Sequence, residues 1–176
     1  MNNYLIHFNP YHDEKGRFSS NNTLFVSGSS HTETKEDLYY RKKLPKDVRR
    51  ELKSSIKARD KIIVGDAPGI DRQVQRYLKS KHYKNVEIYG PGSKVRYSAS
   101  KKWKTNPIDS GKYKPGSKQW LAEKDEAMIK AATKALAVVI ENGGSDVTRK
   151  NVKKIINQHK NVKVYELSTK GDRWIK

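Results

Sequence analysis

The sequence predicts a single α/β domain with a Rossmann-like, doubly wound parallel sheet of about five strands. Short runs rich in β-branched residues alternate with segments of helical periodicity, which is typical of βαβ units. The chain has 176 residues, enough for one ordinary domain with its own core. We expect an extended arm over residues 1–22, the folded domain over 23–168 and a short tail over 169–176.

The predicted elements follow from these patterns. Residues 1–22 combine Asn, His, Pro, Gly and Ser without periodicity, which predicts the arm. The apolar runs predict strands at Thr23–Ser27, Lys61–Gly65, Asn85–Tyr89, Ala135–Ile140 and Asn161–Leu167. Apolar residues at helical spacing predict helices that carry Leu44, Val48, Leu52 and Ile56; Ile70, Val74, Tyr77 and Leu78; Leu121, Met128 and Ala132; and Val152, Ile155, Ile156 and His159. Gly90–Ser117 is too long for an ordinary connection and is a candidate loop or lid.

Composition excludes several function classes. The chain has no cysteine, which excludes disulfides, thiolate metal sites and a cysteine nucleophile. The five histidines show no metal-binding spacing, so we predict no metal and no cofactor. No apolar run approaches the roughly 20 residues that span a bilayer, and the first residues lack the layout of a signal peptide. We therefore expect a cytoplasmic protein without a membrane partner.

The charge of the chain favours phosphate-bearing partners. The 38 Lys and Arg residues outnumber 19 Asp and Glu residues, for a net charge of +19. Seven of these basic residues form a run opposed only by Asp109: Arg96, Lys101, Lys102, Lys104, Lys112, Lys114 and Lys118. A lysine-rich solvated surface explains this run as well as a binding patch does.

Two glycine-containing loops follow the first two predicted strands. Gly28 permits close backbone approach and the Ser29 hydroxyl suits a phosphate, although a plain turn also explains them. The second loop holds Gly65, Asp66, Gly69 and Asp71. Asp66 is expected to cap the following helix and Asp71 to accept hydrogen bonds from ribose hydroxyls, or both aspartates to brace the loop. A bulky residue at Gly69 is expected to block the ligand while leaving the fold mostly intact.

Three further features point to the same edge of the sheet. Asp125 lies on an otherwise apolar helical face, where a carboxylate needs a partner or a site. After the fourth predicted strand, a phosphate cradle is predicted from Gly143, Gly144, Ser145 and Thr148, with a surface turn capped by Thr148 as the alternative. Arg96 is expected to reach a phosphate or to be ordinary surface. We predict that Ser29, Asp71, Asp125 and Thr148 face one pocket.

These motifs together resemble a known superfamily. The segments VSGS, GDAPGIDRQVQRYL, KVRYS, KDEAM and GGSDVTRKN, within Thr23–Leu167, resemble the SLOG superfamily of Rossmann-like domains. That group includes the LOG phosphoribohydrolases, the DNA-processing protein A family and nucleotide-sensing domains of bacterial defence systems. The resemblance implies a nucleotide ligand. Asn151 stands where the LOG enzymes carry the glutamate of their PGGxGTxxE motif, and an amide cannot replace its acid/base chemistry.

The arm carries a second resemblance. Its sequence HFNPYHDEKGRFSS is similar to HxNPxHDxxxGRF segments of head-associated proteins of tailed phages. This implies a phage or prophage origin and a bacterial host cytoplasm. The alternative is a basic-aromatic tail without a dedicated role.

The expected function is binding of a nucleotide or NAD-derived ligand, as in sensing or sequestering a signalling nucleotide during phage–host conflict. An N-glycosidase or phosphoribohydrolase acting on a nucleoside monophosphate is the enzymatic alternative. Single-stranded DNA binding is the third, because the chain has a charge of +19 and aromatic residues are interleaved with lysines at Tyr97, Trp103, Tyr113 and Trp120. If the small-molecule function holds instead, we expect only weak nucleic-acid binding. Core packing is the other role open to these aromatics. Whether the chain is an enzyme or a homo-oligomer stays open at this point.

Overall fold

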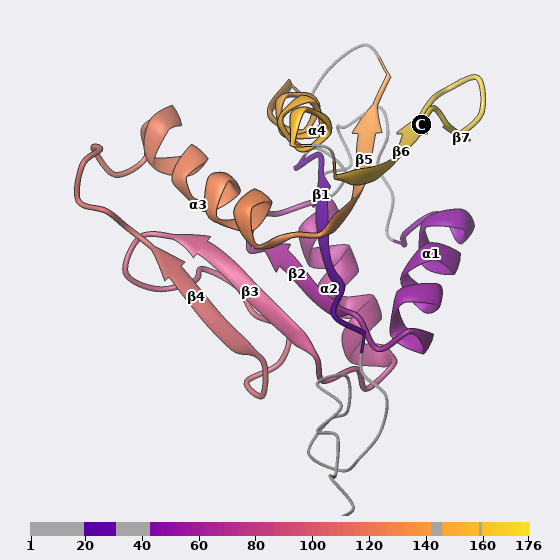
Figure 1. Ribbon diagram of the computed structural model, residues 1–176, viewed down its shortest axis with the longest axis horizontal. Coiled ribbons are helices and arrows are strands. Elements are labelled where there is room, and N and C mark those ends of the chain that lie inside the picture. Colours follow the sequence, from indigo (N-terminus) through magenta and orange to yellow (C-terminus); the bar gives the residue numbers. More distant parts are fainter. Residues whose placement is uncertain (1–19, 31–42, 142–145, 159) are drawn as a thin grey trace, which may run out of the picture.

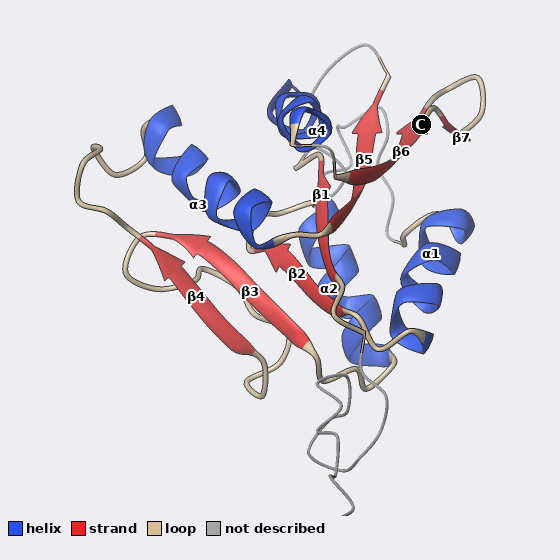
Figure 2. Cartoon of the chain, viewed as in Figure 1, coloured by secondary structure: helices blue, strands red, loops and turns tan. Residues whose placement is uncertain are grey.

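The chain folds into a seven-stranded sheet between two layers of helices (Figure 1; Figure 2). The computed structural model describes residues 20–30, 43–141, 146–158 and 160–176. The strands are β1 (Thr23–Gly28), β2 (Lys61–Gly65), β3 (Val86–Pro91), β4 (Lys104–Ile108), β5 (Lys134–Ile140), β6 (Asn161–Leu167) and β7 (Arg173–Trp174). The helices are α1 (Lys46–Lys57), α2 (Ile70–Ser80), α3 (Lys118–Ala131) and α4 (Asp146–Asn157).

The strand order confirms the predicted doubly wound, Rossmann-like α/β fold. The sheet runs β4-β3-β2-β1-β5-β6-β7, and every pair is parallel except β6 and β7. From β1 the chain builds outward through β2, β3 and β4, and then returns to the other side of β1 to add β5 and β6. The direction of winding therefore reverses between β1 and β5, which makes a crevice at their carboxyl ends.

Two of the seven strands were not expected from the sequence. β4 lies inside the segment 90–117, which was predicted to be a loop, and pairs in parallel with β3. Its sequence, KTNPI, contains a proline and alternates only weakly, so it lacks a strand signal; Pro107 is tolerated because β4 is an edge strand. β7 lies in the predicted tail and pairs antiparallel with β6. The ring of Trp174 packs edge-on against that of Tyr165, with 4.8 Å between the ring centroids.

Each face of the sheet buries its own apolar layer. On one face, α1 and α2 pack Val48, Leu52, Val74 and Leu78 against alternate strand residues such as Val64. On the other face, α3 and α4 contribute Met128, Ile129, Ala132 and Ile155. The predicted helical stripes are largely confirmed, because each supplies residues to one of these layers. Leu121 and Ile156 are corrections, since both are exposed. Leu44 is buried but precedes the start of α1, and His159 lies outside the described residues.

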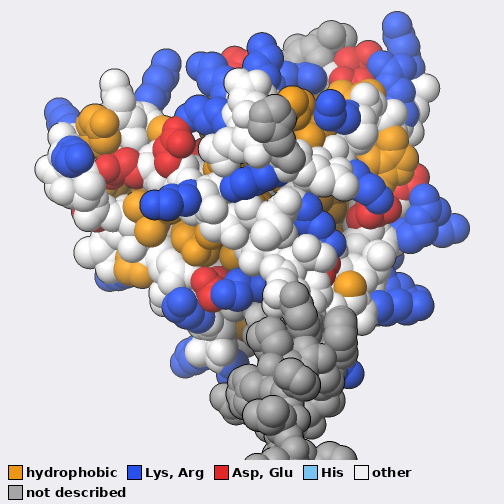
Figure 3. Space-filling model, in the orientation of Figure 1, with side chains coloured by type: hydrophobic (Ala, Val, Ile, Leu, Met, Phe, Trp, Pro, Cys, Tyr) orange, Lys and Arg blue, Asp and Glu red, His pale blue; other side chains and the backbone are white. Residues whose placement is uncertain are grey.

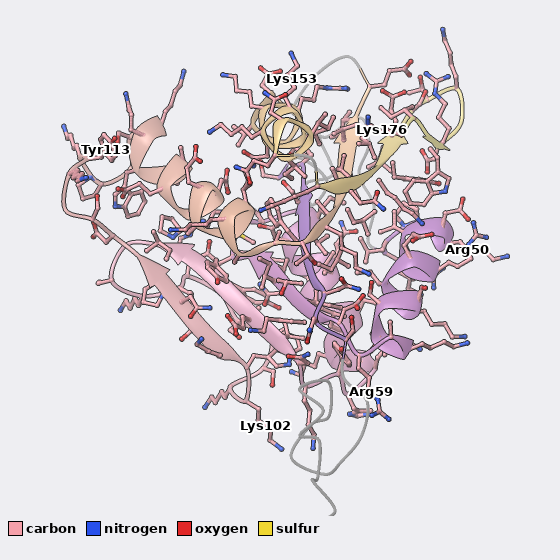
Figure 4. The ribbon with its side chains drawn as sticks, viewed as in Figure 1. Arg50, Arg59, Lys102, Tyr113, Lys153 and Lys176 are labelled. Atoms are coloured by element: carbon pink, nitrogen blue, oxygen red, sulfur yellow. The ribbon has the colours of Figure 1, made fainter. Side chains whose placement is uncertain are left out.

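The positive charge is spread over the surface. In Figure 3, Lys and Arg side chains are scattered over the visible face and interspersed with acidic ones. Figure 4 shows Arg50, Arg59, Lys102 and Lys153 at separate parts of the periphery of the fold. This distribution agrees with a solvated lysine-rich surface. Among the described residues, no helix has the length and apolar character to cross a bilayer.

Candidate functional site

A cavity of about 470 Å³ opens at the carboxyl ends of the central strands. Its walls come from the end of β1 and the serines after it, the loop after β2, the first turn of α2, one side of α3 and the first turns of α4. These elements meet where the strand order reverses, because β1 lies between β2 and β5. The cavity therefore occupies the position where open parallel sheets bind their ligands, and its size is typical of small-molecule sites.

The structure brings most of the predicted site residues to this cavity. Those that line it are Gly28, Ser29, Gly65, Asp71, Arg96, Asp125, Thr148 and Asn151. The expectation that Asp71 and Asp125 share one cavity with Ser29 and Thr148 is therefore confirmed as geometry. Asp66 and Gly69 lie behind the lining, as described below. The predicted cradle residues Gly143, Gly144 and Ser145 lie outside the described residues.

A buried polar cluster forms the floor of the cavity. The Lys124 ammonium lies 2.9 Å from Oδ1 of Asp125, and the Asn151 amide donates to Oδ2 of the same carboxylate at 3.1 Å. Asp71, from α2, completes the cluster and accepts a hydrogen bond from the Ala67 backbone N–H at 3.3 Å. All four polar side chains are buried. The sequence indicated that Asp125 needs a partner, and the structure supplies it from its neighbour Lys124 and from Asn151.

Gly65 makes room for this cluster. A Cβ at Gly65 would clash with the Asp71 carboxylate and lie 2.9 Å from the Lys124 ammonium nitrogen. The two polar groups therefore converge on the backbone at the end of β2, where a side chain would separate them. Gly65 therefore admits Asp71 and Lys124 to the end of β2, and it also lines the cavity.

Burial sets the protonation of the cluster. Burial raises the pKa of Asp71 from 3.8 to about 7, against the opposing attraction of Lys124, and repulsion from Asp125 adds to the rise. Burial alone would lower the pKa of Lys124, but the Asp125 and Asp71 carboxylates outweigh it and raise that pKa. Lys124 therefore stays charged, and Asp71 changes its charge near neutral pH.

The structure contradicts the prediction that Asp66 caps α2. It does not cap α2, whose N-cap residue is Gly69 with no side-chain capping bond. Its carboxylate instead holds Arg96, with Nη2 at 2.5 Å from Oδ1 and Nε at 3.0 Å from Oδ2, and also accepts the Arg96 backbone N–H at 2.7 Å. These hydrogen bonds raise the pKa of Arg96. Asp66 is thus a positioning residue that ties Arg96 to the rim of the cavity.

The structure also contradicts the prediction that a bulky residue at Gly69 would leave the fold mostly intact. It lies against the turn after β1, where a Cβ would clash with the Ser29 carbonyl oxygen and lie 2.7 Å from the Ser30 Cα. Its φ of 81° also favours glycine. The next residue, Ile70, donates its backbone N–H to that Ser29 carbonyl at 3.0 Å. Gly69 therefore joins two site loops to each other, so a side chain there threatens the fold as well as any ligand.

Thr148 is placed inside the cavity rather than at a surface turn. α4 begins at Asp146, so Thr148 lies within the first turn and its side chain is buried. The alternative in which Thr148 only caps the helix at the surface is therefore wrong. Asn151, one turn further along α4, is also buried, and its side-chain amide donates a hydrogen bond to Asp125.

The aromatic residues interleaved with lysines have separate roles. Trp103 is buried in the core and donates its indole N–H to the Tyr83 carbonyl at 2.9 Å. The Tyr97 ring packs under the Arg72 guanidinium, with 5.0 Å between Cζ and the ring centroid. Trp120 is half-buried and only Tyr113 is exposed. Core packing and loop ordering therefore account for most of this set, and no continuous stacking surface follows from it.

The titration of Asp71 predicts a pH-dependent stability. Because the pKa is raised in the folded state, the folded chain holds this proton more tightly than the unfolded chain does, and the resulting stability is full below about pH 4 and is lost as the pH rises through about 7. Asp71→Asn cannot ionise. The difference in free energy of unfolding between Asp71→Asn and the native chain should therefore shift by about 2–4 kcal/mol in favour of the variant as the pH rises from 4 to 8. Urea unfolding at several pH values measures this gain.

The control for this measurement is Asp109→Asn, which removes an exposed carboxylate. Its stability relative to the native chain should change little with pH. A difference between Asp71→Asn and the native chain that is the same at pH 4 and pH 8 would contradict the assigned titration.

Among the described residues, no cluster of His, Asp and Glu side chains has the arrangement of a metal site.

The comparisons with known proteins found no match for this chain. No protein-family model matches the chain, and no curated protein sequence matches it.

Proposed function

We propose that the cavity binds a nucleotide or an NAD-derived nucleotide. The observation that carries this proposal is the position of the cavity, at the carboxyl ends of the strands where the winding of the sheet reverses. Doubly wound folds bind nucleotides at this point, since helix N-termini and strand-end loops converge on it. Here the N-terminal turns of α2 and α4 both contribute to the lining.

The lining suits the sugar of such a ligand. The Asp71 and Asp125 carboxylates offer oxygens that accept hydrogen bonds from ribose hydroxyls. Ser29, after β1, and Thr148, in the first turn of α4, bring hydroxyl groups to the same cavity. The resemblance of residues 23–167 to nucleotide-sensing SLOG domains, and of the arm to phage head-associated proteins, supports a sensing or sequestering role in phage–host conflict.

Hydrolysis of an N-glycosidic bond is the second candidate. The observation that favours it is a carboxyl group in the cavity, Asp71, whose pKa of about 7 suits a general acid at neutral pH. In this scheme Asp71 protonates the base as its bond to the sugar carbon breaks, water adds to that carbon, and the ionised Asp71 carboxylate takes up the proton that the water loses. Asn151 cannot take this part, because an amide neither ionises nor transfers the proton and its N–H is bonded to Asp125.

The binding proposal predicts a specific weakness of Asp71→Asn. At pH 8 the native carboxylate accepts ribose hydroxyls, and its replacement should weaken binding of a ribose-containing nucleotide by about 1–3 kcal/mol. Calorimetry with AMP and NAD⁺ measures the affinity, and chromatography of the same mixtures detects any released base. The exposed Asp109→Asn variant serves as the control and should bind as the native chain does.

The outcomes separate the two candidates. Recovery of unchanged nucleotide from a tight complex supports binding, whereas free base released by the native chain and lost in Asp71→Asn supports hydrolysis. If Asp71→Asn binds AMP and NAD⁺ as tightly as the native chain, the cavity floor is not the ribose site.

A further inference from the structure

The cavity changes character from its floor to its mouth. At the floor, Ser29, Asp71, Thr148 and Asn151 are each 5% exposed or less. At the mouth, Leu121 is 39% exposed and Val147 is 62% exposed, and both still line the cavity. The large exposed hydrophobic residues of the described chain are Tyr113, Leu121, Val147, Ile156 and Ile175. Two of these apolar side chains thus stand over the polar floor.

Each of these two side chains lies one helical turn from a residue of the cavity floor. Leu121 precedes Asp125 by four residues on α3, and Val147 precedes Asn151 by four residues on α4. Residues four apart lie on one face of a helix, separated by about one 5.4 Å turn. Asp125 and Asn151 are hydrogen-bonded to each other across the two helices. Leu121 and Val147 therefore each lie about one turn from a bonded pair at the floor, and both line the exposed mouth of the cavity.

The start of α3 is fixed by a local cap. The Ser117 side chain accepts the Trp120 backbone N–H at 3.2 Å, which satisfies a free donor of the first turn. This cap sets the turn that presents Leu121. Figure 1 shows α4 near the carboxyl end of β1, and α3 and α4 pack on the same face of the sheet.

The charges of the cavity disfavour a phosphate on this floor. Among the described residues, the acids at the cavity or bonded to its rim are Asp66, Asp71, Asp125 and Asp146. Of the described residues that line the cavity, only the cations Arg96 and Lys124 oppose these acids, and both are already paired with carboxylates, at 2.5 and 2.9 Å. A group with hydroxyl donors suits these oxygens, and a flat uncharged ring suits the apolar mouth.

We propose that Leu121 and Val147 clamp the planar base of a nucleotide, whose sugar lies one helical turn deeper against Asp71 and Asp125. This inference rests on the proposed nucleotide function and adds an orientation to it. Aliphatic side chains cover the two faces of a base without reading its hydrogen-bonding edge. The clamp therefore recognises the presence of a base more than its identity.

The test compares ligands with and without a base. AMP and NAD⁺ both carry adenine, whereas ribose 5-phosphate has the sugar and phosphate alone. The double variant Leu121→Ala with Val147→Ala should weaken AMP and NAD⁺ roughly tenfold or more, since it removes most of the apolar surface that covers the base. Its affinity for ribose 5-phosphate should stay within about twofold of the native value.

A matched control separates the clamp from general loss of apolar surface. Ile156 is also exposed and lies on α4, but it does not line the cavity. Ile156→Ala should leave the affinity for all three ligands unchanged. Thermal unfolding of each variant establishes that the chains compared are folded.

The outcomes distinguish failure of the clamp from failure of the proposed nucleotide-binding function. Native affinity of the double variant for AMP and NAD⁺ overturns the clamp, while nucleotide binding by the native chain still supports the proposed function. A native dimer that dissociates in the double variant, with AMP affinity unchanged, overturns the clamp and assigns the apolar mouth to an interface. A native chain that binds none of the three ligands overturns the proposed function and the clamp together.

Discussion

Lys124→Met is expected to lower the free energy of unfolding by about 3–5 kcal/mol at pH 8. The substitution keeps much of the apolar stem but removes the ammonium group that lies 2.9 Å from Asp125 and attracts Asp71. Two buried carboxylates then face each other without a cation, which is far more costly than losing an exposed ion pair. Urea unfolding monitored by circular dichroism measures the loss.

The pH dependence of this loss distinguishes charge from packing. At pH 5 the carboxylates of the Lys124→Met variant can take up protons, so the destabilisation should shrink. Lys130→Met removes the same charge from an exposed position on α3 and should change stability by no more than about 0.5 kcal/mol. A Lys124→Met chain with the stability of Lys130→Met at pH 8 would show that Lys124 does not hold the cluster together.

Gly69→Ala is expected to destabilise the protein by about 2–4 kcal/mol. The new methyl group would clash with the Ser29 carbonyl oxygen and crowd the Ser30 Cα, at a backbone φ of 81° that already disfavours a side chain. Relief requires the turn after β1 and the start of α2 to separate. Nucleotide binding should fall with stability, because both segments line the cavity.

Gly116→Ala is the matched control. Gly116 has a φ of 84°, close to that of Gly69, but a Cβ there would have no described atom within 4 Å. Its destabilisation should stay near the ~1 kcal/mol typical of backbone strain alone. Equal losses in the two variants would mean that the contact with Ser29 and Ser30 contributes nothing.

The sequence was sufficient to predict the order of the central elements. Buried runs such as Ile62–Val64 are apolar on both faces, as a strand between two helix layers requires. β4 could not be found in this way, because Pro107 and Lys104 are typical of a loop and only the position at the sheet edge makes them acceptable in a strand. Local pattern thus predicts the buried strands and fails at the edges.

The cavity could be predicted where it depends on position in the fold, and not where it depends on particular contacts. Asp71 and Asp125 were expected to meet because of their places on helices that flank the central strands, and both line the cavity. The pairing of Asp66 with Arg96 joins residues 30 positions apart and leaves no local signal. Capping is the commonest use of an aspartate before a helix, so sequence reasoning gave Asp66 that role instead.

The edge strand β4 has a consequence for how the protein behaves at high concentration. An open sheet presents unpaired N–H and C=O groups at its outer strands, and these are templates on which another chain can add a strand. Pro107 has no N–H to offer, and the exposed Lys104 places a positive charge along the same edge. A second copy approaching there would meet an interrupted ladder and a like charge. The residues that hid β4 from the sequence pattern are thus the ones that discourage intermolecular β-pairing at this end of the sheet.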